Sequence, residues 1–130
     1  MAEDWTVVDP RDRPREPFQT CDVAHRKLTE ALGATELRVN QVVLEPGDVS
    51  TPHRHERQEE VFVATTDGRI AVEGERRDVP AGGVVRVGPD AIRSLRNDTD
   101  DETHVWLAFG APPIGTVEDF GEYVVPDDVD

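Results

Sequence analysis

The sequence is poor in cysteine, in lysine and in long apolar runs. Cys21 is the single cysteine, so no disulfide can form within the chain. No apolar run approaches the roughly 18 residues of a membrane-spanning helix. The first residues, MAEDWTVVDP, have neither the basic nor the apolar region of a secretory signal. We therefore expect a cytoplasmic protein that has no membrane partner.

Positive charge is also scarce. The 130 residues include 14 Lys and Arg against 28 Asp and Glu, a formal net charge of -14, and Lys27 is the only lysine. Nucleic acids and anionic membrane surfaces are bound largely through basic groups, so the balance argues against both as partners. Acid excess with almost no lysine is typical of halophilic proteins, because concentrated salt screens the self-repulsion. An ordinary acidic protein is the alternative.

Short β-prone segments separated by Gly, Pro, Asn and Asp make up the middle of the chain. The length fits a single domain. No long helical segment alternates with the strands, which argues against a parallel α/β sheet. The pattern predicts an all-β sandwich or barrel. The expected strands are residues 36–44, 61–65, 69–73, 84–87, 94–96 and 103–109.

The two ends of the chain and one short stretch give different predictions. Residues 9–17, DPRDRPREP, alternate proline with charge and predict an extended arm. Leu28, Ala31 and Leu32 would share one face of a short helix that Gly33 stops. The last residues, PDDVD, are expected to fray.

One stretch, residues 51–62 (TPHRHERQEEVF), contains the side chains best suited to metal binding or catalysis. Successive side chains of an extended chain alternate in direction, so His53 and His55 point the same way, as two metal ligands on one strand must. In the strand that follows, Glu59 and Glu60 face opposite sides, so only one can join the histidines. The stretch is either a metal site or a charged strand that happens to hold two imidazoles.

This pattern resembles the first motif of the cupin family, whose members are double-stranded β-helix (jelly-roll) barrels. Gly47 is followed by five residues, the His-x-His pair, four residues and Glu60. A three-residue spacing would select Glu59 instead, but the Val-Phe-Val run after Glu60 favours Glu60. The resemblance covers about residues 28–113. It implies an N-terminal arm at 1–27, a cupin barrel at 28–113 and a C-terminal segment at 114–130.

The second cupin motif is altered at a critical position. The matching stretch is GPDAIRSLRN, and counting back from Asn97 places Arg93 where the family has its third histidine. A guanidinium stays protonated and has no free lone pair, so Arg93 cannot be a metal ligand. The resemblance therefore implies His53, His55 and Glu60 as metal ligands, with the fourth ligand missing.

Two interpretations of the site remain open. In the first, the three ligands hold a divalent ion (Fe, Mn, Ni or Zn) as in the two-histidine, one-carboxylate site of non-haem iron oxygenases. Arg93 is then a catalytic residue that orients an anionic small-molecule substrate, and a dioxygenase fits best. In the second, no metal is bound, Arg93 pairs with Glu60, and the barrel is a non-catalytic binder of a small molecule.

The other candidate residues carry weaker predictions. His104 alternates with Trp106 on a strand, where a hydrogen-bonded histidine is more frequent than a metal ligand. Phe62 and Asn97 are candidates for the pocket lining. Small cupins commonly pair through an edge strand or an arm, so the resemblance implies a homodimer to which residues 5–8 or 37–44 supply the contact.

Overall fold

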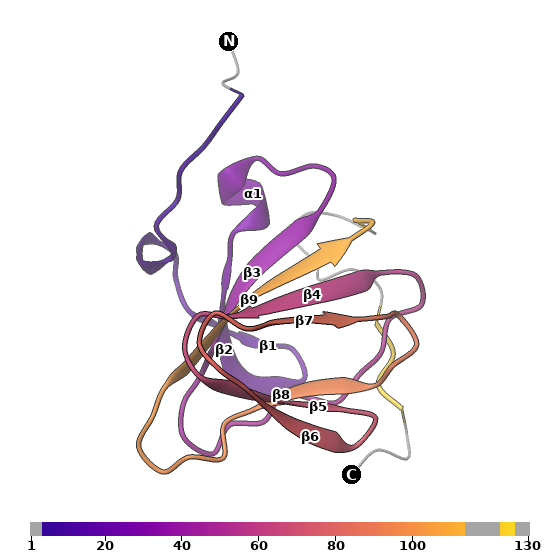
Figure 1. Cartoon of the computed structure of the whole chain (residues 1–130). Helices are drawn as coiled ribbons and strands as arrows, with labels where there is room; N and C mark the ends of the chain where they lie inside the picture. The colour runs from indigo at the N-terminus through magenta and orange to yellow at the C-terminus, as the bar shows by residue number, and fades with distance from the viewer. Residues whose placement is uncertain (1–3, 114–122, 127–130) are drawn as a thin grey trace.

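The computed structural model describes residues 4–113 and 123–126, which form two antiparallel sheets packed against each other (Figure 1). The helical elements in these ranges are a 3-10 turn, η1 (Pro10–Asp12), and a short helix, α1 (Thr29–Leu32). The smaller sheet has the order β6 (Glu75–Val79), β5 (Gly68–Val72) and β8 (Arg93–Arg96). The larger sheet has the order β1 (Glu16–Phe18), β2 (Cys21–Lys27), β3 (Arg38–Leu44), β9 (His104–Ala111), β4 (Glu59–Ala64) and β7 (Val84–Val87). The architecture is the all-β jelly roll that the sequence predicts.

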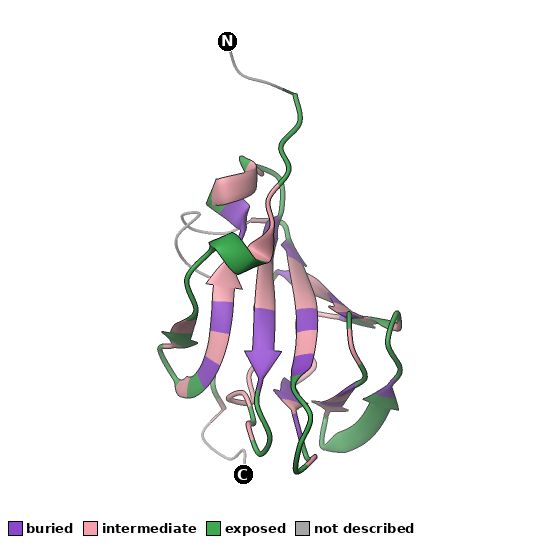
Figure 2. Ribbon diagram, turned by 90° about the vertical axis from the view of Figure 1, so that its left-hand side faces the viewer, coloured by how far each residue is buried: buried purple, intermediate pink, exposed green. Residues whose placement is uncertain are grey.

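The core lies between the two sheets and determines which way each strand faces. Buried and less buried stretches alternate along the strands (Figure 2). On β4, Phe62 and Ala64 are buried, whereas Glu59 is exposed. Glu60 shares the inward face with Phe62, because residues two apart on a strand point the same way. Trp106 of β9 packs directly over β5, and a Cβ added at Gly68 would lie 2.5 Å from its ring. The core consists of Val23, Val42, Leu44, Phe62, Ala64, Ile70, Val79, Val87, Leu95 and Trp106.

Residues 16–27 correct the expectation of an arm that extends to residue 27. They form β1 and β2, and β2 pairs with β3 in the larger sheet. Prolines and charges indicated an extended chain, but an edge strand is also extended and tolerates proline. Pro17 lies in β1, the edge strand, beside a register shift. In β2, Val23 and His25 are buried, so this segment belongs to the barrel.

The remaining element predictions hold apart from one missed strand and the turn η1, which lies within the stretch 9–17 that was expected to be extended. The six strands expected from the sequence are present, with ends shifted by up to a few residues. The short helix ends at Gly33, whose φ of 74° places it in the left-handed region that glycine favours. Strand β6, with the sequence ERRDV, was missed because four of its five residues are exposed and it shows no apolar alternation.

Of the two segments expected to supply a dimer contact, residues 37–44 lie inside a sheet and residues 5–8 lie at the surface. Strand β3 lies between β2 and β9, so residues 37–44 offer no open sheet edge, which corrects that expectation. Trp5 and Val7 are 70% and 81% exposed, on a segment that leads away from the barrel (Figure 1). The homodimer itself stays a prediction. Most of the segment 114–130, including nearly all of the tail expected to fray, lies outside the described residues.

Within the part of the chain that the structure describes, the helices are too short and too polar to cross a membrane.

Candidate metal centre

The His-x-His segment lies beside β8 and is fixed there through its backbone. The amide of His53 donates to the carbonyl of Arg93 at 3.1 Å, and the amide of Arg93 donates back at 2.9 Å. The amide of His55 donates to the carbonyl of Pro89 at 2.9 Å. These bonds hold the segment in the extended form that makes the two imidazoles point the same way, as the sequence predicts.

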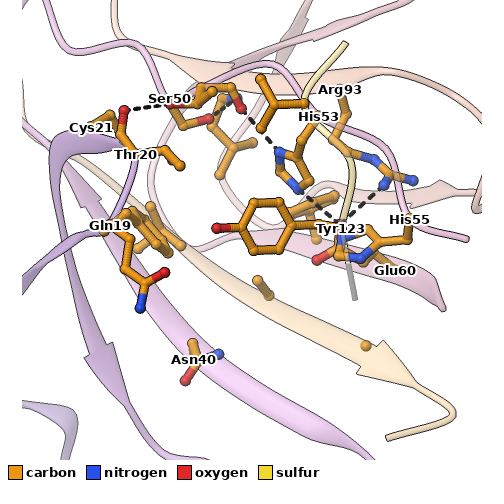
Figure 3. Close-up of a pocket in the computed structure, with 18 of the residues that line it drawn as sticks. Gln19, Thr20, Cys21, Asn40, Ser50, His53, His55, Glu60, Arg93 and Tyr123 are labelled. Atoms are coloured by element: carbon orange, nitrogen blue, oxygen red, sulfur yellow. Dashed lines mark hydrogen bonds and ion pairs between the residues drawn. The ribbon is translucent and has the colours of Figure 1, made fainter. Parts of the chain in front are cut away.

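The two histidines converge with Glu60 from the neighbouring strand β4 (Figure 3). Nε2 of His55 lies 3.1 Å from Oε1 of Glu60, and Nε2 of His53 lies 3.9 Å from the same oxygen. One possible ligand atom from each residue lies within 4.8 Å of the others. Among the described residues, this is the cluster of His, Cys, Asp and Glu that could hold a metal ion.

The two glutamates lie on opposite faces of β4. Glu59 is exposed on the outer face, where its carboxylate pairs with Arg86 of β7. Glu60 faces inward, and its side chain is only 13% exposed. Glu60 and not Glu59 therefore lies with the two histidines, and its role as a metal ligand stays a prediction.

Hydrogen bonding prepares His53 to donate a lone pair into the cluster. Its Nδ1 lies 3.0 Å from the carbonyl oxygen of Thr51. A carbonyl oxygen only accepts, so in the neutral ring Nδ1 carries the proton and Nε2 presents its lone pair toward Glu60. Burial lowers the pKa of His53, against the opposing charge of Glu60, and this favours the neutral ring that a metal requires.

The carboxylate of Glu60 is held in its ionised form. Burial on its own would raise the pKa of Glu60, but the hydrogen bond from His55 and the interactions with the two histidines and Arg93 outweigh it. The pKa of Glu60 is therefore lowered. Two imidazole nitrogens and a buried carboxylate suit a divalent transition-metal ion, so the donor set fits such an ion.

Arg93 occupies the remaining side of the cluster. Its side chain is 1% exposed, and its Nη1 lies 3.6 Å from Oε1 of Glu60. Nη2 donates to the carbonyl of Gly88, while Nε and Nη1 have no hydrogen-bond partner among the described residues. Burial lowers the pKa of Arg93, opposed by the charges of Glu60 and Glu73. The structure thus contains both the contact between Arg93 and Glu60 that the metal-free interpretation expects and the three converging ligands that the metal interpretation expects.

The cluster opens into a cavity of about 110 Å³ between the two sheets (Figure 3). Phe62 lines it, as the sequence predicts. Asn97 does not, which corrects that expectation: it is buried elsewhere and donates to the carbonyls of Leu44 and Glu102. Most of the cavity wall is apolar, with Phe18, Val42, Phe62, Leu95, Ala108 and Val125 contributing.

The sequence analysis missed the contribution of residues 123–126, a segment we call the strap. Its backbone pairs with the residue between the two histidines: the amide of Val124 donates to the carbonyl of Arg54 at 2.7 Å, and the reverse bond is 3.0 Å. The ring of Tyr123 meets that of His53 edge-on, with centroids 5.9 Å apart. Tyr123 and Val125 both line the cavity. No motif could have revealed this, because the contact spans some seventy residues of sequence.

Two other residues considered in the sequence analysis, His104 and Cys21, lie outside the ligand cluster. His104 is buried and lies 3.7 Å from Glu102, outside the ligand cluster. Its position on β9 outside the cluster agrees with the expectation, but its buried Nδ1 has no hydrogen-bond partner among the described residues. Cys21, expected in the arm, begins β2 and lines the cavity.

Solved structures similar to this chain share its fold. A cupin protein from Bacteroides fragilis has 19% identity and a TM-score of 0.67, covering 92% of this chain and 97% of its own. A predicted oxalate decarboxylase from Thermotoga maritima has 21% identity and a TM-score of 0.69, covering 81% and 97%. A polyketide cyclase from Streptomyces resistomycificus has 18% identity and a TM-score of 0.71, covering 81% and 78%. No curated protein matches the sequence.

Fold and site together define a class: a jelly-roll barrel with a possible two-histidine, one-glutamate metal site in its interior. The sequence profile described as the cupin domain matches residues 40–109, more than half of the chain. The chain therefore belongs to the cupin domain family, as its first motif indicates.

Proposed function

We propose that this chain is a metal-dependent enzyme that acts on a small anionic organic molecule, with a dioxygenase as the reaction type that best suits the ligand set. One observation carries the proposal. His53, His55 and Glu60 converge with their ligand atoms within 4.8 Å, inside a cavity large enough to admit a small molecule. When bound by three protein groups, a divalent ion supplies Lewis acidity and, if it is iron, redox chemistry with dioxygen.

Other residues of the chain would contribute binding, orientation and exclusion of water. Arg93 has a buried Nη1 donor that faces the site, and we propose that it binds the anionic group of the substrate. The strap brings Tyr123 against His53 and closes one side of the cavity. Most of the cavity wall is apolar, and a substrate that fills the cavity would displace water from it, which strengthens the electrostatic interactions at the site.

The similar structures support a small organic substrate without naming it. They include a predicted oxalate decarboxylase and a polyketide cyclase, which carry out different reactions on one fold. A fold alone does not assign a reaction, so the support comes from the site.

The first test is the metal content of protein purified without a histidine tag, followed by titration of the apo protein with Fe²⁺, Mn²⁺, Ni²⁺ and Zn²⁺. We expect one ion per chain and loss of at least about a hundredfold in affinity in Glu60→Gln. Glu59→Gln is the matched control, because Glu59 lies on the outer face of the same strand. Apo protein that takes up none of the four ions would refute the proposal.

The second test concerns the reaction type. Protein loaded with Fe²⁺ is incubated with candidate organic acids while dissolved oxygen is measured. Consumption of oxygen that depends on iron and on an acid supports a dioxygenase. Turnover without oxygen consumption would contradict the dioxygenase assignment and leave the metal-dependent enzyme standing.

A second candidate function is a binding barrel without catalysis. The 3.6 Å contact between Arg93 and Glu60 favours it, because the guanidinium can partner the buried carboxylate in place of an ion. In that case the apo protein would bind small acids with no metal added. Unchanged acid affinity after saturation with each of the four ions would select this function.

A further inference from the structure

Within the part of the chain that the structure describes, Nη1 of Arg93 has no hydrogen-bond acceptor. Nη1 is buried, and its 3.6 Å separation from Oε1 of Glu60 is too long for a hydrogen bond. Buried polar groups are almost always paired, and an unpaired donor of a charged group is costly. An acceptor on a ligand is therefore expected in front of Nη1, next to the metal ligands.

The charges at the site require that acceptor to be negative. Glu60 provides one negative charge, whereas a divalent ion and Arg93 together provide three positive charges. His53 and His55 are neutral as ligands. Such an imbalance opposes the binding of the ion, because Arg93 and the ion repel each other at short range and Arg93 is buried. An anion placed between them reverses the repulsion by attracting both.

The rest of the cavity indicates what the anion carries. The wall away from the metal ligands is formed largely by aromatic and aliphatic side chains, including Phe18, Val42 and Leu95. The ring of Tyr123 adds a further apolar surface beside His53. Polar residues such as Arg38, Asn40 and Ser50 also line the cavity, but most of its wall is apolar. A ligand with an apolar body therefore buries more of this wall than a hydroxylated or doubly charged body.

We infer that the cavity takes a small carboxylic acid with a compact apolar body, whose carboxylate bridges Arg93 and the bound ion, so that acid and ion bind cooperatively. This inference rests on the proposed metal site. Arg93 is then the reason that the site functions with three ligands: the fourth side of the ion is completed by the substrate and not by the protein.

The test measures binding in both directions on the full-length protein by calorimetry. Zn²⁺ is titrated in the presence and absence of benzoate, and benzoate is titrated with and without Zn²⁺. We expect each to tighten the other by the same factor, about tenfold or more, because coupling between two binding sites is reciprocal. Benzamide, which has the same shape and no charge, should give no coupling. Succinate, which has two carboxylates and no apolar body, should give less.

Variants locate the coupling. Arg93→Met should still bind Zn²⁺ but lose the effect of benzoate, and Arg93→Lys, which keeps the charge, should retain part of it. Arg86→Met is the matched control, since Arg86 pairs with Glu59 on the outside of the barrel, and it should keep full coupling. The wild-type titrations decide the inference even where a substitution at position 93 prevents folding.

The outcomes separate this inference from the proposed function. Zn²⁺ that binds equally well with and without benzoate overturns cooperative binding and leaves the metal site intact. Absence of Zn²⁺ binding under both conditions overturns the metal site as well. Stronger coupling with succinate than with benzoate overturns the apolar body as the substrate class.

Discussion

The residue at position 93 sets the charge beside the candidate metal ligands. A histidine would supply a lone pair, whereas Arg93 supplies a permanent positive charge at the same place in the motif. At a separation of about 6 Å and an effective dielectric of about 20, that charge repels a divalent ion by on the order of 5 kcal/mol before any anion intervenes. The backbone bonds between residue 93 and His53 do not depend on the side chain, so the position can be changed without removing them.

We therefore expect Arg93→His to bind divalent ions more tightly than the wild type in the absence of any acid. The added ligand and the removed repulsion should together raise Zn²⁺ affinity by at least about tenfold, or about 1.4 kcal/mol. Calorimetric titration measures this, and circular dichroism verifies the fold. A well-folded variant with unchanged Zn²⁺ affinity would show that position 93 does not face the ion. A variant that fails to fold would show that Arg93 is structural.

His25 is a second buried histidine whose role lies in stability. It is 2% exposed and stacks on Phe18, with ring centroids 4.2 Å apart. Burial lowers its pKa below the ordinary value of 6.5, with Glu16 opposing the shift and Lys27 adding to it. As pH falls below the unfolded-state pKa, the unfolded chain takes up the proton first, so the native state loses stability down to the folded-state pKa.

We expect the free energy of unfolding to decrease as pH is lowered from 7 towards 5, and to decrease less in His25→Gln. The variant has no imidazole to protonate at this position, so that part of the pH dependence disappears. His53 also has a lowered pKa, so some dependence remains. Urea unfolding at several pH values measures both proteins. Identical slopes in the two would mean that His25 is not protonated on unfolding in this range.

At the level of single residues, the sequence predicted side-chain directions that depend only on local backbone geometry. The alternation of an extended chain was enough to align His53 with His55 and to separate Glu60 from Glu59. The contact of Tyr123 with His53 and the burial of Asn97 away from the cavity could not be predicted, because both depend on how distant segments pack. Asn97 is two residues from Leu95, which lines the cavity, yet its amide donates to the carbonyls of Leu44 and Glu102.

At the level of elements, the strap contacts the candidate site through both its backbone and its side chains. Its four described residues reach the His-x-His segment through two backbone hydrogen bonds between Arg54 and Val124. Tyr123 and Val125 flank this pair and both line the cavity. Since Arg54 lies between the two candidate ligands, the strap supports the segment that carries them.

We expect Val124→Pro to loosen the His-x-His segment, because proline removes the amide that donates to Arg54. Loss of one hydrogen bond, worth about 1 kcal/mol, should speed amide hydrogen exchange at Arg54 by about fivefold. Val124→Ala keeps the amide and serves as the control. Exchange rates by NMR make the comparison, and equal protection of Arg54 in the two variants would mean that the strap does not support this segment.

The elements differ in how well the sequence revealed them. Strands with alternating apolar residues, such as β4, were predicted because one face is buried. Strand β2 has a single strong β-former, Val23, among its buried residues and follows a proline-rich stretch, so it was assigned to the arm. Strand β6 is almost wholly exposed, and its sequence therefore contains no buried pattern to recognise.

For the whole molecule, the dominant physical property is its charge of -14. Much of the acid excess lies on the surface, as in the loop that contains Asp100 and Asp101, both exposed. Like charges on a compact protein repel one another more than in the expanded unfolded chain, so the repulsion lowers stability. At 1 M salt the Debye length is only about 3 Å, and the repulsion is largely screened.

We therefore expect the melting temperature to rise between 0.1 and 2 M KCl, by about 5 °C or more, which corresponds to roughly 1 kcal/mol for a domain of this size. The double variant Asp100→Lys, Asp101→Lys makes the net charge less negative by four units, so its melting temperature should be higher at low salt and should respond less to KCl. Neither position belongs to the core or the candidate metal site. Differential scanning calorimetry across the salt series compares the two proteins. A wild-type melting temperature that is already maximal at 0.1 M KCl would contradict a halophilic adaptation and support an ordinary acidic protein.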